Sequence, residues 1–240
     1  KEGLENLGVD VSLYKDSTRP TTLKQRFRAN GKTLLRVNHL KQHGIENSIE
    51  KKIIDEIKQE IDSYDLIVFS DFSYGVLTKK IISQVSKMAK DRNIFTSADS
   101  QSSSQIGDIS KFKNMTLVTP TEREIRLSLN DFESGLVVLS DKLRQLSNMK
   151  YIFTTLGAEG ILIYNSHENE LLTDSVTALG SSVKDVSGAG DSLMISSSMA
   201  LATGASIWES AYLGSLASAI QVSRIGNIPI SKSELLNELK

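Results

Sequence analysis

From about Ser48 onward, the chain alternates between apolar residues at helical spacing and short continuous apolar runs. Ile49, Ile53 and Ile57 recur at helical spacing, and the apolar run 66–69 follows them. A continuous apolar run suits a strand that is covered on both faces, and its alternation with amphipathic helices is typical of repeated βα units. We therefore expect an α/β fold with a doubly wound, mainly parallel sheet flanked by helices.

The same alternation predicts the other elements of this core. Helices are expected over 49–61, 81–88, from 121, 133–147, 191–202 and 206–223. Strands are expected over 66–69, 93–98, 115–118, 151–155, 161–164 and 171–176. We expect the last two strands to be neighbours, because only a polar turn at 165–169 separates them.

The segment before Ser48 has a different pattern, which is typical of a β-ribbon. Residues 21–28 and 33–38 alternate in polarity on either side of Asn30-Gly31, a pair that favours a tight hairpin turn. We expect this ribbon, over about 18–40, to project from the α/β body. Its basic residues have two interpretations, a solvated strand face or a lid that presents cations to an anionic substrate; they are Lys24, Arg26, Arg28, Lys32 and Arg36.

Composition narrows the possible partners. The 28 Lys and Arg and 29 Asp and Glu give a net charge of −1, without long like-charge blocks, which argues against binding to nucleic acid or to a membrane surface. The absence of cysteine excludes disulfides, thiol nucleophiles and thiolate metal sites. No run approaches the roughly 20 apolar residues of a membrane span. We therefore expect a single cytoplasmic domain that acts on small molecules.

The most informative motif is Gly188-Ala189-Gly190-Asp191, between a predicted strand and a helix rich in small residues. Two glycines allow a tight turn whose backbone N–H groups point one way, and the helix adds the positive end of its dipole. Such a turn is an anion hole. A carboxylate beside it suits phosphoryl transfer, in which it accepts the proton of an attacking hydroxyl. The structural alternative is an ordinary cap at a sharp strand-to-helix turn.

Three further loops are candidates for ligand contact. Thr119 and Glu122 fit a capping box, which leaves Glu124 either to organise Mg²⁺ through water or to serve as a solvated first-turn acid. The glycines in 154–160 permit a hairpin turn or a close approach of the backbone to a base or phosphate. Gly226 lies in another glycine loop, for which helix termination is the simpler explanation.

In this order, the motifs resemble the ribokinase-like carbohydrate kinases of the phosphofructokinase-B group, from Thr21 to the end of the chain. Segments 21–26, 34–38, 70–77 and 117–120 look most like the D-glycero-β-D-manno-heptose 7-phosphate kinases, the kinase part of ADP-heptose synthases. The resemblance implies a ribokinase-like sheet with a ribbon lid, ATP and Mg²⁺ as cofactors, a sugar or sugar-phosphate substrate, and a homodimer paired through the ribbon.

The resemblance also implies roles for individual residues. It makes Asp191 the catalytic base and Gly188, Ala189 and Gly190 the anion hole. Glu124 corresponds to the glutamate that organises Mg²⁺, indirectly through water. The implied nucleotide contacts are Ser187, Thr155, Gly157, Gly160, Ser215 and Gly226. The expected substrate contacts are Asp71 and, because charge-assisted bonds to phosphate favour basic side chains, Lys24, Arg26 and Arg36.

Three sites depart from the family pattern. Thr121 replaces an asparagine, Ser215 stands where relatives often carry asparagine, and Asp99-Ser100-Gln101 lies where the heptose kinases tend to have Asp-Pro-Lys. The family's first strand and glycine-rich sugar-binding segment should precede Lys1. We therefore expect residues 1–240 to form one N-terminally incomplete kinase domain, with its core over about 48–240. These departures favour a second hypothesis, a catalytically impaired regulatory module that binds a nucleotide or sugar.

Overall fold

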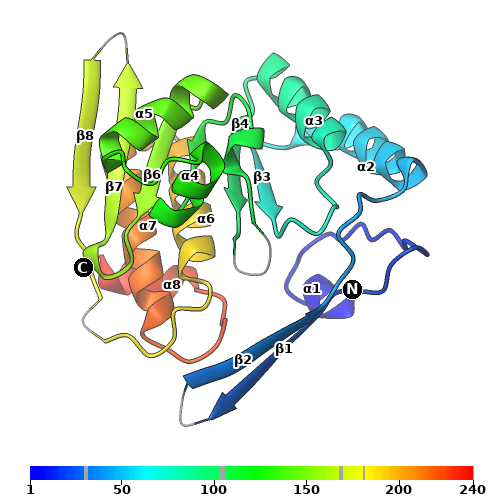
Figure 1. Ribbon diagram of the computed structural model, residues 1–240, viewed down its shortest axis with the longest axis horizontal. Coiled ribbons are helices and arrows are strands. Elements are labelled where there is room, and N and C mark those ends of the chain that lie inside the picture. The colour runs from blue at the N-terminus through cyan, green and yellow to red at the C-terminus, as the bar shows by residue number, and fades with distance from the viewer. Residues whose placement is uncertain (30–31, 103–105, 168–169, 181, 240) are drawn as a thin grey trace.

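The computed structural model describes residues 1–29, 32–102, 106–167, 170–180 and 182–239. Its body contains a six-stranded sheet in the order β3-β4-β5-β6-β7-β8 (Figure 1). The strands are β3 (Leu66–Asp71), β4 (Phe95–Ser100), β5 (Leu117–Val118), β6 (Tyr151–Thr155), β7 (Ile161–His167) and β8 (Glu170–Val176). Strands β3 to β6 pair in parallel, and β7 and β8 are antiparallel, so the prediction of a mainly parallel sheet is confirmed.

Helices cover both faces of this sheet (Figure 1). One face carries α2 (Asn47–Glu60), α3 (Lys79–Asp91), α4 (Glu122–Leu129) and α5 (Leu136–Ser147), and the other carries α6 (Ala189–Ala202) and α7 (Ile207–Val222). Val118 and Ile152 belong to the first core, whereas their neighbours Leu117 and Phe153 belong to the second. Because successive strand residues point to opposite faces, both faces need apolar side chains, which explains the continuous apolar runs.

Helices α6 and α7 approach each other closely because small residues lie between them. A Cβ atom at Gly214 would lie 2.0 Å from the Ser197 hydroxyl oxygen and 2.9 Å from the Leu193 carbonyl oxygen. The Ser197 hydroxyl donates a hydrogen bond of 2.9 Å to the carbonyl oxygen of Ser210 on α7. The small-residue composition of this segment therefore reflects the short distance between the two helices.

The predicted ribbon is present as the antiparallel strands β1 (Leu23–Ala29) and β2 (Lys32–His39). The expected turn residues Asn30 and Gly31 lie outside the described part of the chain. Arg26 is directly opposite Arg36 in the register, and Phe27 is directly opposite Leu35 on the other face. The ribbon projects away from the helices and strands of the body (Figure 1).

Two short terminal helices are also present, α1 (Glu2–Glu5) and α8 (Lys232–Glu238), of which α8 was not predicted. A signal for α8 exists, because Ser231 and Glu234 have the spacing of a capping box and form one. Single turns of 3-10 helix also occur, η1 (Ile61–Ser63), η2 (Ile109–Lys111) and η3 (Gly157–Glu159). Among the described residues, no helix combines the length and the apolar character that crossing a membrane requires.

Candidate active site

A cavity of 430 Å³ lies between the end of β6 and helices α6 and α7. Six predicted site residues line it, namely Thr155, Gly157, Gly160, Ala189, Gly190 and Ser215. Much of the remaining wall is apolar and includes Leu179, Val183 and Leu193. The Ser215 hydroxyl is buried without a hydrogen-bond partner among the described residues. A mostly apolar wall with few polar groups is typical of a site for a small molecule.

The predicted sharp turn precedes α6. Gly188 is the N-cap of this helix with φ of +81°, and a Cβ atom there would lie 2.2 Å from the Asn227 side-chain oxygen. The left-handed backbone therefore favours glycine, and any other residue would also have to displace the Asn227 side chain. Helix α6 begins at Ala189, and the N–H groups of a first helical turn have no acceptor four residues earlier. The Ala189 N–H donates to the Val186 carbonyl oxygen at 3.3 Å, so the N–H groups that remain without an intrahelical acceptor are those of Gly190 and Asp191, the second and third residues of the helix.

Asp185 holds the loops on either side of this turn. Its Oδ1 atom accepts the Ser187 N–H at 3.1 Å and the Ser187 hydroxyl at 2.8 Å, while Oδ2 accepts the Gly226 N–H at 3.3 Å. The bonds from Ser187 hold the pKa of Asp185 below its usual value. Arg28 of the ribbon lies 3.8 Å from the same carboxylate. Ser187 and Gly226 are therefore fixed beside the turn and do not belong to the cavity wall.

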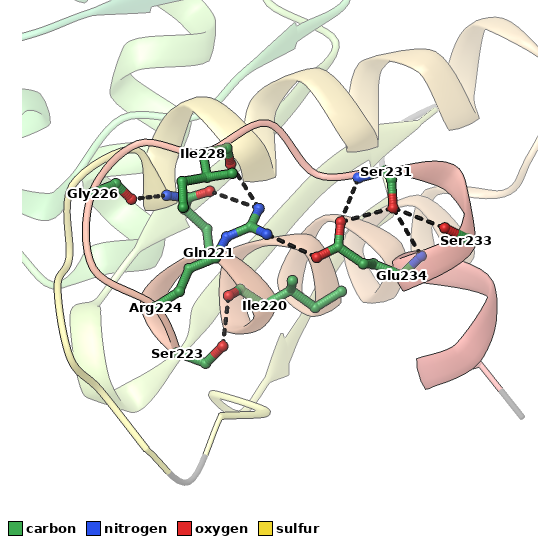
Figure 2. A network of polar contacts seen from close by, with 9 residues as sticks. All are labelled: Ile220, Gln221, Ser223, Arg224, Gly226, Ile228, Ser231, Ser233 and Glu234. Carbon is green, nitrogen blue, oxygen red and sulfur yellow. Dashed lines mark hydrogen bonds and ion pairs between the residues drawn. The ribbon is translucent and has the colours of Figure 1, made fainter.

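A buried amide completes this arrangement. Gln221 Nε2 donates to the carbonyl oxygens of Gly226 at 2.9 Å and of Ser187 at 3.2 Å. Figure 2 shows the neighbouring contacts of Arg224, which binds the Glu234 carboxylate at 2.8 Å and the Ile228 carbonyl oxygen at 2.7 Å. The loop after α7 is thus fastened both to α8 and to the turn before α6.

Asp71, a predicted substrate contact, lies at the carboxyl end of β3 and is only 3% exposed. Its carboxylate accepts hydrogen bonds from the Ser73 N–H at 2.9 Å, the Ser73 hydroxyl at 3.1 Å and the Ser100 hydroxyl at 3.1 Å. Lys111 of η2 forms an ion pair with it. Sequence reasoning did not single out Lys111, because its surroundings carry no motif and its partner is forty positions away.

The predicted cap of α4 is wrong by two residues. The N-cap is Thr121 rather than Thr119, and Glu124 rather than Glu122 closes the capping box. The reason is that Pro120 and Thr121 continue the pairing with β6, since the Thr155 N–H donates to the Pro120 carbonyl oxygen at 2.9 Å. Glu124 therefore has a structural role: one oxygen accepts the N–H and hydroxyl of Thr121, both at 2.8 Å.

Several carboxylates gather at this edge of the sheet. Burial and the negative charges of Glu124 and Asp191 raise the pKa of Asp99, at the end of β4, to about 7. Within the described ranges, no three His, Cys, Asp or Glu side chains form a ligand set for a metal ion. The edge is acidic, but its carboxylates do not by themselves surround a cation.

The cationic face of the ribbon contacts the body at two points. Lys24 Nζ lies 4.2 Å from the centre of the Phe72 ring and 5.1 Å from that of Tyr74, at the turn after β3. Arg28 contacts Asp185 beside the turn before α6. Arg26 and Arg36 lie between these contacts along the ribbon, both exposed. This placement favours the lid interpretation over a solvated strand face.

A second cavity, of 1180 Å³, lies between segment 10–22 and α2. It contains none of the predicted site residues, and most of its charged lining is acidic. Asp71 and Thr155 instead lie at the carboxyl ends of the parallel strands β3 and β6, where ligands bind in doubly wound sheets.

Comparison with known proteins agrees with this arrangement. The family model described as pfkB family carbohydrate kinase matches residues 1–234. The bifunctional protein HldE of Helicobacter hepaticus is 29% identical over 239 residues, which cover 98% of this chain and 48% of the relative. HldE of Sulfurimonas denitrificans is 30% identical over 237 residues, 97% of this chain and 48% of the relative. The chain thus spans about half the length of these curated relatives.

Solved structures share the fold. Ribokinase from Giardia lamblia has a TM-score of 0.77 at 20% identity, covering 99% of this chain and 77% of that one. Phosphofructokinase-2 from Escherichia coli, solved in complex with substrates and products, has a TM-score of 0.68 at 18% identity, covering 90% of this chain and 68% of that one. The expected ribokinase-like fold is therefore confirmed, and the match along almost the whole sequence shows that the chain belongs to the pfkB family of carbohydrate kinases.

Proposed function

We propose that this chain transfers the γ-phosphoryl group of ATP to a hydroxyl of a sugar phosphate, with D-glycero-β-D-manno-heptose 7-phosphate as the expected acceptor. One observation carries the proposal: the start of α6 combines a glycine turn, part of a cavity wall and a carboxylate. Gly188 forms the turn, Ala189 and Gly190 line the 430 Å³ cavity, and Asp191 follows them on the helix. The choice of acceptor rests on the resemblance to the heptose kinases and on the similarity to HldE.

In this proposal, Asp191 is the catalytic base. Its carboxylate accepts the proton of the acceptor hydroxyl while the hydroxyl oxygen forms a bond to the γ-phosphorus. The bond between the γ-phosphorus and the bridging oxygen breaks, and ADP leaves. The N–H groups of Gly190 and Asp191, which have no intrahelical acceptor, stabilise the charge on the transferred group.

The cavity is the proposed site of the adenine base. Its apolar wall suits the faces of the ring, and the unpartnered Ser215 hydroxyl supplies a polar contact. Thr155, Gly157 and Gly160 line the same cavity, so the base and ribose would lie against the loop after β6. The phosphates would then extend toward the turn at Gly188.

The carboxylates at this edge of the sheet suit a Mg²⁺ ion that is bound together with the phosphates of ATP. Burial and the negative charges of Glu124 and Asp191 raise the pKa of Asp99 to about 7, and a divalent cation would offset this repulsion. Mg²⁺ prefers oxygen ligands and keeps several waters. Glu124 would hold it through water, because both of its oxygens already accept hydrogen bonds within the protein. When bound, the metal ion neutralises charge on the phosphates.

Arg26 and Arg36 are the proposed contacts for the phosphate of the acceptor. Like charges directly opposite each other on a ribbon are destabilising, and a bound phosphate would offset this cost. Lys24 would hold the base of the ribbon against Phe72 and Tyr74. Asp71 remains a proposed sugar contact, with Lys111 as its counter-ion.

The test is an assay of ADP release with heptose 7-phosphate, fructose 1-phosphate, ribose and adenosine as acceptors. We expect Asp191→Asn to lower turnover by about 10²- to 10⁴-fold, the usual contribution of a general base, without weakening ATP binding measured by calorimetry. Asp91→Asn, at an exposed position at the end of α3, is the matched control and should leave turnover unchanged.

Other outcomes distinguish the alternatives. Substantial turnover by Asp191→Asn would exclude this residue as the base. ATP binding without turnover on any acceptor would favour the regulatory module, a hypothesis that the engagement of Glu124 in a helix cap also favours. Activity on adenosine alone would assign the chain to a nucleoside acceptor.

A further inference from the structure

Segment 100–102, directly after β4, contacts three carboxylates that come from three different elements. The three bonds run from the Ser100 hydroxyl to Asp71 at 3.1 Å, from Gln101 Nε2 to Asp191 Oδ1 at 3.2 Å, and from the Ser102 N–H to Glu124 Oε1 at 2.9 Å. The sequence places Asp99-Ser100-Gln101 where the heptose kinases tend to have Asp-Pro-Lys, without assigning a role to Ser100 or Gln101. Segment 100–102 therefore connects the ends of β3, α6 and α4.

Asp191 behaves differently from the acidic residues at the same position of other helices. Glu124, Glu209 and Glu234 are each the third residue of a helix, and each folds back to accept the backbone N–H of its own N-cap. Asp191 has the same position on α6, but its carboxylate accepts the Gln101 amide. The N-caps of the three other helices are extended, whereas Gly188 is left-handed, so α6 has no capping box and the described hydrogen bond to its third residue comes from the segment after β4.

The backbone and the side chain of Gln101 are both held in place. Its backbone N–H donates to the Asp71 carbonyl oxygen at 2.9 Å, which extends the pairing of β3 with β4 by one residue. The side chain is partly buried, so few rotamers are open to it. A fixed donor restricts the carboxylate to one orientation without adding a charge to the site.

We infer that Gln101 is a positioning residue that keeps the Asp191 carboxylate turned away from the backbone of its own helix and toward the acceptor hydroxyl. The inference rests on the proposed function of Asp191 as the base. Without the amide, no other hydrogen bond described for the Asp191 carboxylate holds it in this orientation, so it is free to rotate toward the N–H groups at the start of α6. In that orientation it would compete with the phosphates for the anion hole and would no longer face the hydroxyl.

The test compares Gln101→Met, which has a similar length but no donor, with Gln101→Lys, which keeps an N–H donor. We expect Gln101→Met to lower kcat by about 10- to 100-fold, as the loss of a hydrogen bond to a charged group does, with KM for ATP changed less than about twofold. Gln101→Lys should retain most of kcat. Gln145→Met is the matched control, because Gln145 makes the same kind of bond to Asp141 on the exposed side of α5, at 2.6 Å.

A kcat of Gln101→Met close to that of the wild type, or equal losses in the Met and Lys variants, would overturn the inference. A second measurement does not depend on activity. The side-chain amide signals of Gln101 in a ¹⁵N–¹H NMR spectrum, assigned by their absence in Gln101→Met, should shift in Asp191→Ala and remain in place in Asp141→Ala. If the wild type phosphorylates no acceptor, the proposed function fails, whereas unshifted amide signals would refute the contact itself.

Discussion

Asp99 shows how its surroundings control the ionisation of a single residue. Its pKa is about 7 in the folded protein and 3.8 in the reference state, because burial and the charges of Glu124 and Asp191 oppose ionisation. A raised pKa means that the folded state binds this proton more tightly than the unfolded state does. The associated stability is fully present below about pH 4 and is lost as the pH rises through 7.

We therefore predict that Asp99→Asn flattens the pH dependence of stability. Between pH 5 and pH 8, without divalent cations, the free energy of unfolding of the wild type should fall relative to that of the variant by on the order of 2 kcal/mol. Urea unfolding at several pH values measures this difference. Parallel curves for the two proteins would show that Asp99 ionises normally in the folded state.

At the scale of single residues, the sequence predicts best where a contact is local. Gly188 and Asp191 belong to one short motif, so their proximity follows from their spacing. The partners of Asp191 and Asp71 do not follow from local spacing, because Gln101 lies 90 positions from Asp191 and Lys111 lies 40 positions from Asp71. Such contacts arise only when the sheet brings its strand ends together, which no local pattern encodes.

At the scale of elements, the helix start near residue 120 shows where local rules leave a choice. Thr119 with Glu122 and Thr121 with Glu124 both fit a capping box, and helix propensity does not separate them. The pairing of Pro120 and Thr121 with Thr155 keeps the chain extended and selects the later start. The order and type of the long elements were predictable because each carries its own periodicity, whereas this boundary depends on a neighbouring strand.

Helices α6 and α7 give a prediction at this scale. Gly214→Ala should lower the free energy of unfolding by about 1–2 kcal/mol, because the new methyl group meets Ser197 and the Leu193 carbonyl oxygen, although alanine is the better helix former. Thermal and urea unfolding measure the change.

Gly44→Ala is the control for this prediction, since the nearest atom to its Cβ lies 3.8 Å away on Thr78. Ser197→Ala in the Gly214→Ala background should recover part of the loss, because it removes the hydroxyl that the methyl group meets. A Gly214→Ala protein as stable as the wild type would mean that the two helices can move apart without cost.

At the scale of the whole molecule, the two faces of the ribbon have different partners. The face with Lys24 and Arg28 contacts the body, whereas Leu23, Phe27 and Leu35 on the other face are about half exposed, at 52%, 51% and 54%. A row of exposed apolar side chains on a ribbon suits pairing with another apolar surface. A second copy of the chain provides such a surface by symmetry, which supports the expected homodimer.

Phe27→Asp should therefore convert a dimer into a monomer in size-exclusion chromatography with light scattering, because it places a charge in the apolar face. Leu13→Asp, at a leucine that is 67% exposed outside the ribbon, should leave the mass unchanged. A monomeric wild type at micromolar concentration would contradict the prediction.

The single carboxylate of Asp185 has a consequence for ligand binding. It bonds the loop before α6 and the loop at Gly226, and it attracts Arg28 of the ribbon. The position of the ribbon and the shape of the turn at Gly188 are therefore energetically coupled through this carboxylate. Such a coupling is reciprocal. If an acceptor bound under the ribbon changes the affinity for nucleotide by some factor, the nucleotide changes the affinity for the acceptor by the same factor.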